Sequence, residues 1–168
     1  PRSVLRGWKV TDDSAAMLIM EHELFRHIEM ELFVTRQHLP VALDYVQKIL
    51  TVAGRASTEI PDLQFDTTEK DRLEALRGRY GHHYPICVRR VLADDAMISM
   101  TSDRDQDSYA ISLISYAKPA KRQGFMQTME FLAKTMSQRF GARPHWGKYC
   151  PLSSEELVAL YPQFAQFQ

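Results

Sequence analysis

The chain has 168 residues, of which 45% are hydrophobic and 25% charged, and its 21 basic and 21 acidic residues give a formal net charge of zero. This balance fits a single globular domain and gives no support for a nucleic-acid or anionic-membrane surface. No apolar run approaches the roughly 20 residues of a membrane-spanning helix, and two cysteines, Cys87 and Cys150, do not indicate a disulfide framework.

The first clear element is a strand at residues 28–34, IEMELFV, whose apolar residues alternate with polar ones. Glu29 and Glu31 share the face opposite the apolar residues. Apolar residues then recur at helical spacing over 39–52, after a Pro40 that suits a first helical turn, which predicts an amphipathic helix. Residues 14–25, SAAMLIMEHELF, fit a helix or a strand equally well.

The middle of the chain predicts a loop at 54–68 and a short helix around 69–78. The stretches 84–92 and 96–100 are predicted to be two strands around an Asp-Asp turn. The strand at 108–117 is apolar on both faces, which predicts a central position in a sheet.

In the last third, Pro119 opens a helix that runs to Phe140, with Gly141 suited to a left-handed C-cap. Ser153 and Glu156 have the spacing of a capping box and start a short final helix. The order of elements predicts an α+β fold, an antiparallel sheet with helices packed on it.

Cofactor and metal motifs are missing from the sequence. Neither GxGxxG nor GxxxxGK occurs among the seven glycines, so the pyrophosphate of a nucleotide cofactor would have to be held elsewhere. The spacing of the histidines and cysteines matches no zinc pattern, and we expect no metal site.

Three basic residues in two segments are candidates for chemistry. Arg89 and Arg90 sit in an apolar strand and must point to opposite faces, and a guanidinium that faces inward needs an anionic mate. The alternative is an edge-strand arginine paired with Glu29 or Glu31. Lys148 follows Trp146-Gly147 and could stabilise developing negative charge, and the alternative is a solvated loop lysine.

Three stretches of the chain resemble a known family. RPHWGK (143–148) with LSSEELVALYPQFAQF (152–167) is similar to the C-terminal region of the sugar-lactone and alditol oxidases, FAD enzymes of the vanillyl-alcohol-oxidase superfamily. HIEMELFVTRQHLPVAL (27–43) and VRRVLADDAMISM (88–100) resemble further family passages in the same order and spacing.

The resemblance implies that residues 1–168 form a single C-terminal cap domain of a two-domain FAD enzyme. FAD would be bound mainly by an N-terminal domain that this chain lacks, and the chain alone is expected to be inactive. The full protein would oxidise a hydroxyl-bearing small molecule, such as a sugar lactone, a polyol or a related alcohol, by hydride transfer to flavin. We expect a cytoplasmic protein without a membrane span, with peripheral membrane association left open.

The resemblance also assigns residues to the site. Arg89 and Lys148 match the family's catalytic arginine and lysine, and His145 and Trp146 are expected to face substrate or cofactor. Cys87 stands where the family commonly has glutamate, and Ser112 is a weak match to a sugar-facing threonine.

Two other interpretations remain. Cys87 supports a non-catalytic α+β module that binds a ligand or a protein partner. A weaker idea, against which the zero net charge argues, is an RNA-binding face made of Arg77, Arg79, Lys118, Lys121, Arg122 and Arg139.

Overall fold

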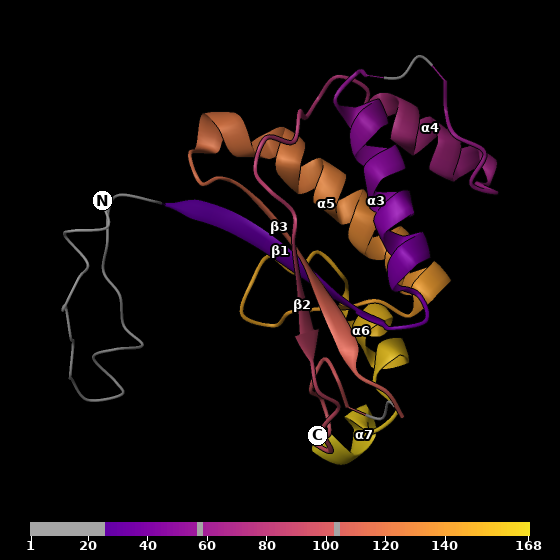
Figure 1. The fold of residues 1–168 in the computed structure, drawn as a ribbon, viewed down its shortest axis with the longest axis vertical. Helices are drawn as coiled ribbons and strands as arrows, with labels where there is room; N and C mark the ends of the chain where they lie inside the picture. The colour runs from indigo at the N-terminus through magenta and orange to yellow at the C-terminus, as the bar shows by residue number, and fades with distance from the viewer. Residues whose placement is uncertain (1–25, 57–58, 103–104) are drawn as a thin grey trace, which may run out of the picture.

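The computed structural model describes residues 26–56, 59–102 and 105–168. Helices α3 and α5 pack on one side of an antiparallel sheet, and α4 packs against α3 (Figure 1). The four strands lie in the order β2-β3-β1-β4. They are β1 (His27–Thr35), β2 (Cys87–Val91), β3 (Ser108–Tyr116) and β4 (Arg143–Pro144). The helices are α3 (Leu39–Ala53), α4 (Thr67–Ala75), α5 (Pro119–Phe140), α6 (Ser154–Leu160) and α7 (Phe164–Phe167). The predicted fold class is therefore confirmed.

The register of the sheet sorts its side chains onto two faces. Glu31 on β1 pairs with Ser112 on β3, and Ser112 pairs in turn with Cys87 on β2. Because directly paired residues share a face, these three form one row across the sheet. The alternate residues of β1, such as Met30 and Leu32, point to the helices instead and are fully buried.

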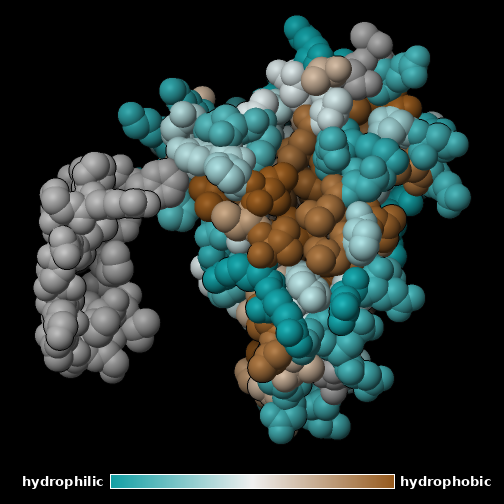
Figure 2. All heavy atoms as spheres, viewed as in Figure 1, coloured by the Kyte–Doolittle hydropathy of each residue, from teal (hydrophilic) through white to brown (hydrophobic). Residues whose placement is uncertain are grey.

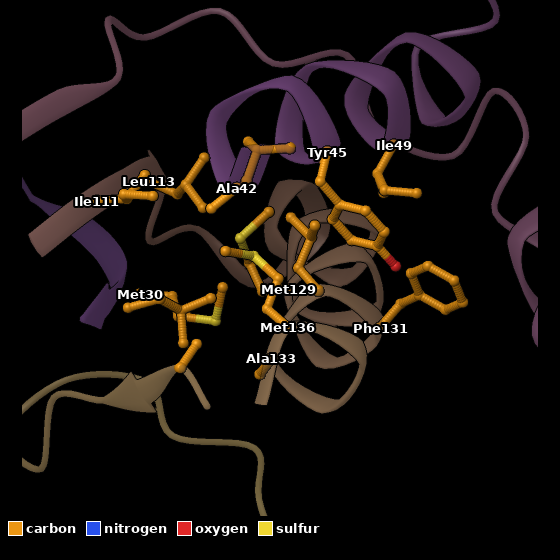
Figure 3. Close-up of a cluster of buried hydrophobic side chains, with 14 of the residues drawn as sticks. Met30, Ala42, Tyr45, Ile49, Ile111, Leu113, Met129, Phe131, Ala133 and Met136 are labelled. Atoms are coloured by element: carbon orange, nitrogen blue, oxygen red, sulfur yellow. The ribbon is translucent and has the colours of Figure 1, made fainter. Parts of the chain in front are cut away.

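The core lies between the sheet and helices α3 and α5 (Figure 3). Figure 3 shows Met30, Ile111 and Leu113 of the strands facing Met129 and Met136 of α5. Tyr45 of α3 closes the far side and meets the ring of Phe65 edge-on, with the ring centroids 6.0 Å apart. Because burial of apolar area places the helices on one face of the sheet, the opposite face, which carries Glu31, Ser112 and Cys87, is not covered by α3 or α5.

An apolar groove of about 660 Å³ opens beside α3 and the edge strand β2, where Figure 2 shows brown side chains gathered. Leu43 and Leu50 line it from α3, and Ile86 and Val88 line it from the β2 side. The groove thus belongs to the helix-covered face and is separate from the row of Glu31, Ser112 and Cys87.

The helix ends follow the predicted chemistry. Ser153 and Glu156 form the expected capping box at the start of α6, and Asp66 and Glu69 form another at α4. Gly141 ends α5 with φ of 58°, in the left-handed region where a side chain is strained. The predicted elements at 28–34, 39–52 and 108–117 are observed with boundaries one residue different or fewer at each end. Residues 14–25 lie outside the described residues.

One predicted strand is wrong. Residues 96–100 form turns, because the Asp94 carboxylate accepts hydrogen bonds from the backbone N–H of Ala96 (2.9 Å) and from the hydroxyls of Ser99 and Thr101. These local bonds offer the backbone an alternative to strand pairing. The same contacts fold residues 94–102 into a compact loop beside β2.

Gly124 marks the closest approach between α5 and the turn that follows α4. A Cβ built at Gly124 would lie 2.0 Å from the carbonyl oxygen of Arg79. Helix propensity alone predicts that Gly124→Ala stabilises the protein. Because the added Cβ would collide with the Arg79 carbonyl, we expect instead a loss of about 2–3 kcal/mol in the free energy of unfolding. Urea denaturation measures it. Gly81→Ala is the control, because nothing lies within 4 Å of its Cβ position, and its effect should stay within about 1 kcal/mol of zero. A neutral Gly124→Ala would contradict the packing described.

Candidate active site

The candidate site lies on the face of the sheet that the core helices leave uncovered. Glu29 and Glu31 project there from β1, Arg89 from β2 and Ser112 from β3, as the strand register requires. Lys148 reaches the same place from the segment that follows β4. Residues far apart in the sequence are therefore brought together by antiparallel pairing.

Two carboxylates and two cations form the centre of this site. Glu31 accepts hydrogen bonds through Oε1 from Arg89 Nη2 and from Ser112 Oγ, the latter at 2.6 Å. Lys148 Nζ bonds Glu29 Oε2 and lies 3.9 Å from Glu31 Oε2. Arg89 and Lys148 thus converge on adjacent carboxylates of one strand face.

Glu31 is the most buried member, with a side chain that is 0% exposed. Burial raises the pKa of this carboxyl, but the hydrogen bonds from Ser112 and Arg89 and the charges of Lys148 and Arg89 outweigh it, so the pKa lies below its ordinary value. Glu31 is therefore ionised near neutral pH. Its charge lowers the cost of holding two cations close together.

The Lys148 segment is held against β1 by backbone hydrogen bonds. The N–H of His145 donates to the carbonyl of Glu31, and the N–H of Tyr149 donates to the carbonyl of Glu29, each at 2.9 Å. A tight turn between them is closed by the N–H of Lys148, which donates to the carbonyl of His145 at 3.1 Å. The lysine therefore sits on a fixed backbone.

Trp146 and His145 pack rather than point freely into solvent. The Trp146 indole N–H donates to the carbonyl of Ile98 at 2.9 Å, and its ring stacks on Tyr161 at 5.2 Å. The His145 ring lies 6.1 Å from that of Phe33. These contacts tie the Lys148 segment to the loop at 94–102 and to the end of α6.

Sequence reasoning missed Arg143, which is buried in the same junction. Its guanidinium lies 4.5 Å from the centre of the Tyr161 ring and donates to the carbonyls of Leu160 (2.9 Å) and Ser102 (2.6 Å). One cation thus joins β4, the loop at 94–102 and the C-terminal end of α6, where the helix dipole favours it. An arginine before a proline in a turn-like stretch carries no signal of such burial.

A hollow of about 410 Å³ opens beside the charged centre, between the sheet face and the loop at 94–102. Glu31, Phe33, Arg89, Thr101 and His145 are among the residues that line it. Lys148 does not line this hollow, and it meets the charged centre through its bond to Glu29. Its lining is mainly polar and charged, and the apolar members are Phe33, Val91 and Met100.

The other candidate residues are placed as follows. Cys87 is exposed and has a free thiol at the end of the row that contains Ser112. Arg90 points to the opposite face from Arg89 and bonds Asp107 at 2.7 Å. In the suggested RNA-binding face, Arg77 bonds Glu74 and Arg139 bonds Glu69, so part of its charge is already paired.

The described residues lack two further features. They contain no group of three or more His, Cys, Asp or Glu side chains placed to hold a metal ion. None of their helices combines the length and the apolar character needed to cross a lipid bilayer.

Comparison with known proteins identifies the family. The sequence profile described as D-arabinono-1,4-lactone oxidase matches residues 2–168. The chain belongs to this family. The resemblance seen in the sequence is thereby confirmed.

Individual relatives carry related names. The chain is 52% identical over 172 residues to a "Long-chain alcohol oxidase" from an uncultured marine euryarchaeote, a match that covers 100% of this chain and 36% of that protein. It is 36% identical over 88 residues to the L-gulonolactone oxidase of Scyliorhinus torazame and 31% identical over 86 residues to that of Mus musculus, each covering 51% of this chain and 19% of the relative. The chain thus spans about a third or less of the length of these relatives.

Proposed function

We propose that residues 1–168 form the substrate-binding cap domain of an FAD-dependent oxidoreductase that acts on a hydroxyl group. Membership of the D-arabinono-1,4-lactone oxidase family supports this, as do relatives named for alcohol and lactone oxidation. The observation that carries the proposal is the convergence of Arg89 and Lys148 on the sheet face opposite the core helices. FAD would be bound mainly by an N-terminal domain of the same protein, which is expected in the cytoplasm.

The described residues are better suited to cover the flavin ring, which accepts the hydride, than to bind the whole cofactor. Arg89 is 61% exposed although it bonds a buried carboxylate, so its donors remain available to a group above the sheet. The sequence has no glycine-rich loop for a pyrophosphate. Arg89 and Lys148 would therefore face the substrate and the flavin ring, with the buried Ser112 bonded to Glu31 behind them, and the phosphates would be held outside this chain.

The roles of the two cations follow from their charge. When an alcohol is oxidised, its carbon loses a hydride to the acceptor and its hydroxyl proton passes to water, so negative charge develops on that oxygen before the carbonyl forms. A bound flavin supplies the hydride acceptor. Arg89 and Lys148, prepositioned by Glu31 and Glu29, would stabilise the oxygen with hydrogen bonds that need no reorganisation.

Two apolar side chains near the charged centre, the thiol of Cys87 and the name of one relative support a less polar alcohol over a polyol. Ile114 pairs with Glu29 and therefore shares the site face, and Phe33 lines the hollow. The sulfur of Cys87 is a weaker hydrogen-bond acceptor than a carboxylate. The relative that covers the whole chain is named for long-chain alcohols. We infer that the substrate is a long-chain aliphatic alcohol.

The test is anaerobic reduction of the complete, flavin-loaded protein. Mixing with 1-decanol should bleach the oxidised flavin absorbance, and a sugar lactone or xylitol should act more slowly. A protein that binds no flavin, or whose flavin no alcohol or lactone reduces, would support the alternative of a non-catalytic ligand- or protein-binding module. Flavin reduced faster by xylitol than by decanol would support oxidation but overturn the aliphatic substrate.

A further inference from the structure

The side chain of Glu31 is more constrained by its surroundings than the side chain of its partner Arg89. The Glu31 side chain is 0% exposed and that of Arg89 is 61% exposed. Glu31 extends from a strand paired on both sides, and Ser112 holds its Oε1 at 2.6 Å. A long, exposed arginine side chain would otherwise sample many rotamers. The carboxylate is thus the fixed point that sets where the guanidinium lies.

The second oxygen of Glu31 also faces the site. Glu31 Oε2 is buried and has no hydrogen-bond partner among the described residues, and Lys148 Nζ lies 3.9 Å away. At that distance in a buried setting the two charges still attract strongly. Glu31 therefore acts on both cations, through a direct bond to Arg89 and through its field at Lys148.

The charges of the centre cancel. Arg89 and Lys148 contribute two positive charges, and Glu29 and Glu31 contribute two negative ones, so their sum is zero. Two adjacent cations without these carboxylates would form a site for a carboxylate or phosphate. Of the two acids, Glu31 is the fully buried one and cannot turn away into solvent to release its cation.

We propose that Glu31 is a positioning and specificity-determining residue, which fixes Arg89 and excludes anionic molecules so that the site takes an uncharged alcohol. This inference rests on the proposed function. It predicts that removing the charge of Glu31 converts the site into one that binds carboxylates.

The test compares Glu31→Gln with the unchanged complete protein. Decanoate, an anion that cannot be oxidised at a hydroxyl, is the binding probe in calorimetry, and 1-decanol is the substrate. Glu31→Gln should bind decanoate about tenfold more tightly, because one buried negative charge is gone and Arg89 is released. Its kcat with decanol should fall about tenfold while KM changes less than about twofold, since the loss of the Arg89 position acts on the transition state.

Two further variants separate charge from shape. Glu31→Asp keeps the charge and shortens the side chain, so it should lower kcat without any gain in decanoate binding. Glu74→Gln removes an exposed acid bonded to Arg77 on α4, and should leave both measurements unchanged. If circular dichroism shows that Glu31→Gln does not fold, Ser112→Ala takes its place, with an expected several-fold fall in kcat and unchanged decanoate binding.

The outcomes distinguish this inference from the function on which it rests. If no alcohol reduces the flavin of the unchanged protein, the proposed function fails. If the unchanged protein oxidises decanol but Glu31→Gln matches it in kcat and in decanoate affinity, the role given to Glu31 is overturned. Wild-type kcat in Ser112→Ala would overturn the positioning role.

Discussion

Lys148→Met is expected to slow flavin reduction by an alcohol by about 10²–10³-fold, because one preorganised donor to the developing oxyanion is removed. Methionine keeps the length of the side chain and loses its charge. The backbone bonds of His145 and Tyr149 to β1 remain, so the fold of the segment should be kept. Stopped-flow absorbance under anaerobic conditions measures the reduction step separately from reoxidation.

The control for Lys148→Met is Lys134→Met. Lys134 bonds Glu130 at 2.9 Å on α5, in a partly exposed helical pair of a kind that contributes about 0.5 kcal/mol. This variant should reduce its flavin at the wild-type rate. Equal rates for Lys148→Met and the wild type would show that Lys148 serves only to pair with Glu29.

Arg89→Met is expected to reduce both activity and stability. It leaves the buried Glu31 with only Ser112 and the more distant Lys148, and a charged group that loses its partner in this way costs about 2–3 kcal/mol. Flavin reduction should fall by about 10² or more, for the reason given for Lys148. Urea denaturation and stopped-flow absorbance measure the two effects.

The stability loss of Arg89→Met should depend on pH. In the unchanged protein the pKa of Glu31 is lowered, so its carboxylate stabilises the fold above the ordinary value of 4.5, and this contribution is lost as pH falls through the folded pKa. Without Arg89, two of the contributions that lower this pKa are gone, so the pKa of Glu31 lies higher than in the unchanged protein, and protonation removes the uncompensated charge. The stability difference between the two proteins should therefore shrink between about pH 7 and pH 4. A difference that is constant over this range would contradict the pairing.

Much of the fold could be predicted from the sequence because local signals agreed with tertiary packing. The alternation in β1 placed Met30 and Leu32 in the core, and Gly141 ended α5 where its left-handed backbone allows. The apolar faces of residues 108–117 correctly indicated an inner strand, since β3 lies between β2 and β1.

The rest depends on contacts between distant parts of the chain. Residues 96–100 were predicted to be a strand because their apolar residues alternate. That alternation does not show that the Asp94 carboxylate bonds to these residues and folds them into turns. The complete burial of Glu31 also escaped prediction, because the covering groups come from β2, β3 and the segment after β4. Period-two alternation assigns a face, but it does not say whether that face meets water.

The most direct measurement is a crystal structure of the complete protein with reduced flavin and bound 1-decanol. Reduced flavin cannot accept a hydride, so the alcohol stays intact. The hydroxyl oxygen should lie within about 3.2 Å of a guanidinium nitrogen of Arg89 and of Lys148 Nζ, above the row of Glu31 and Ser112. A hydroxyl bound elsewhere, with neither cation in contact, would contradict the assignment of this face as the site of oxidation.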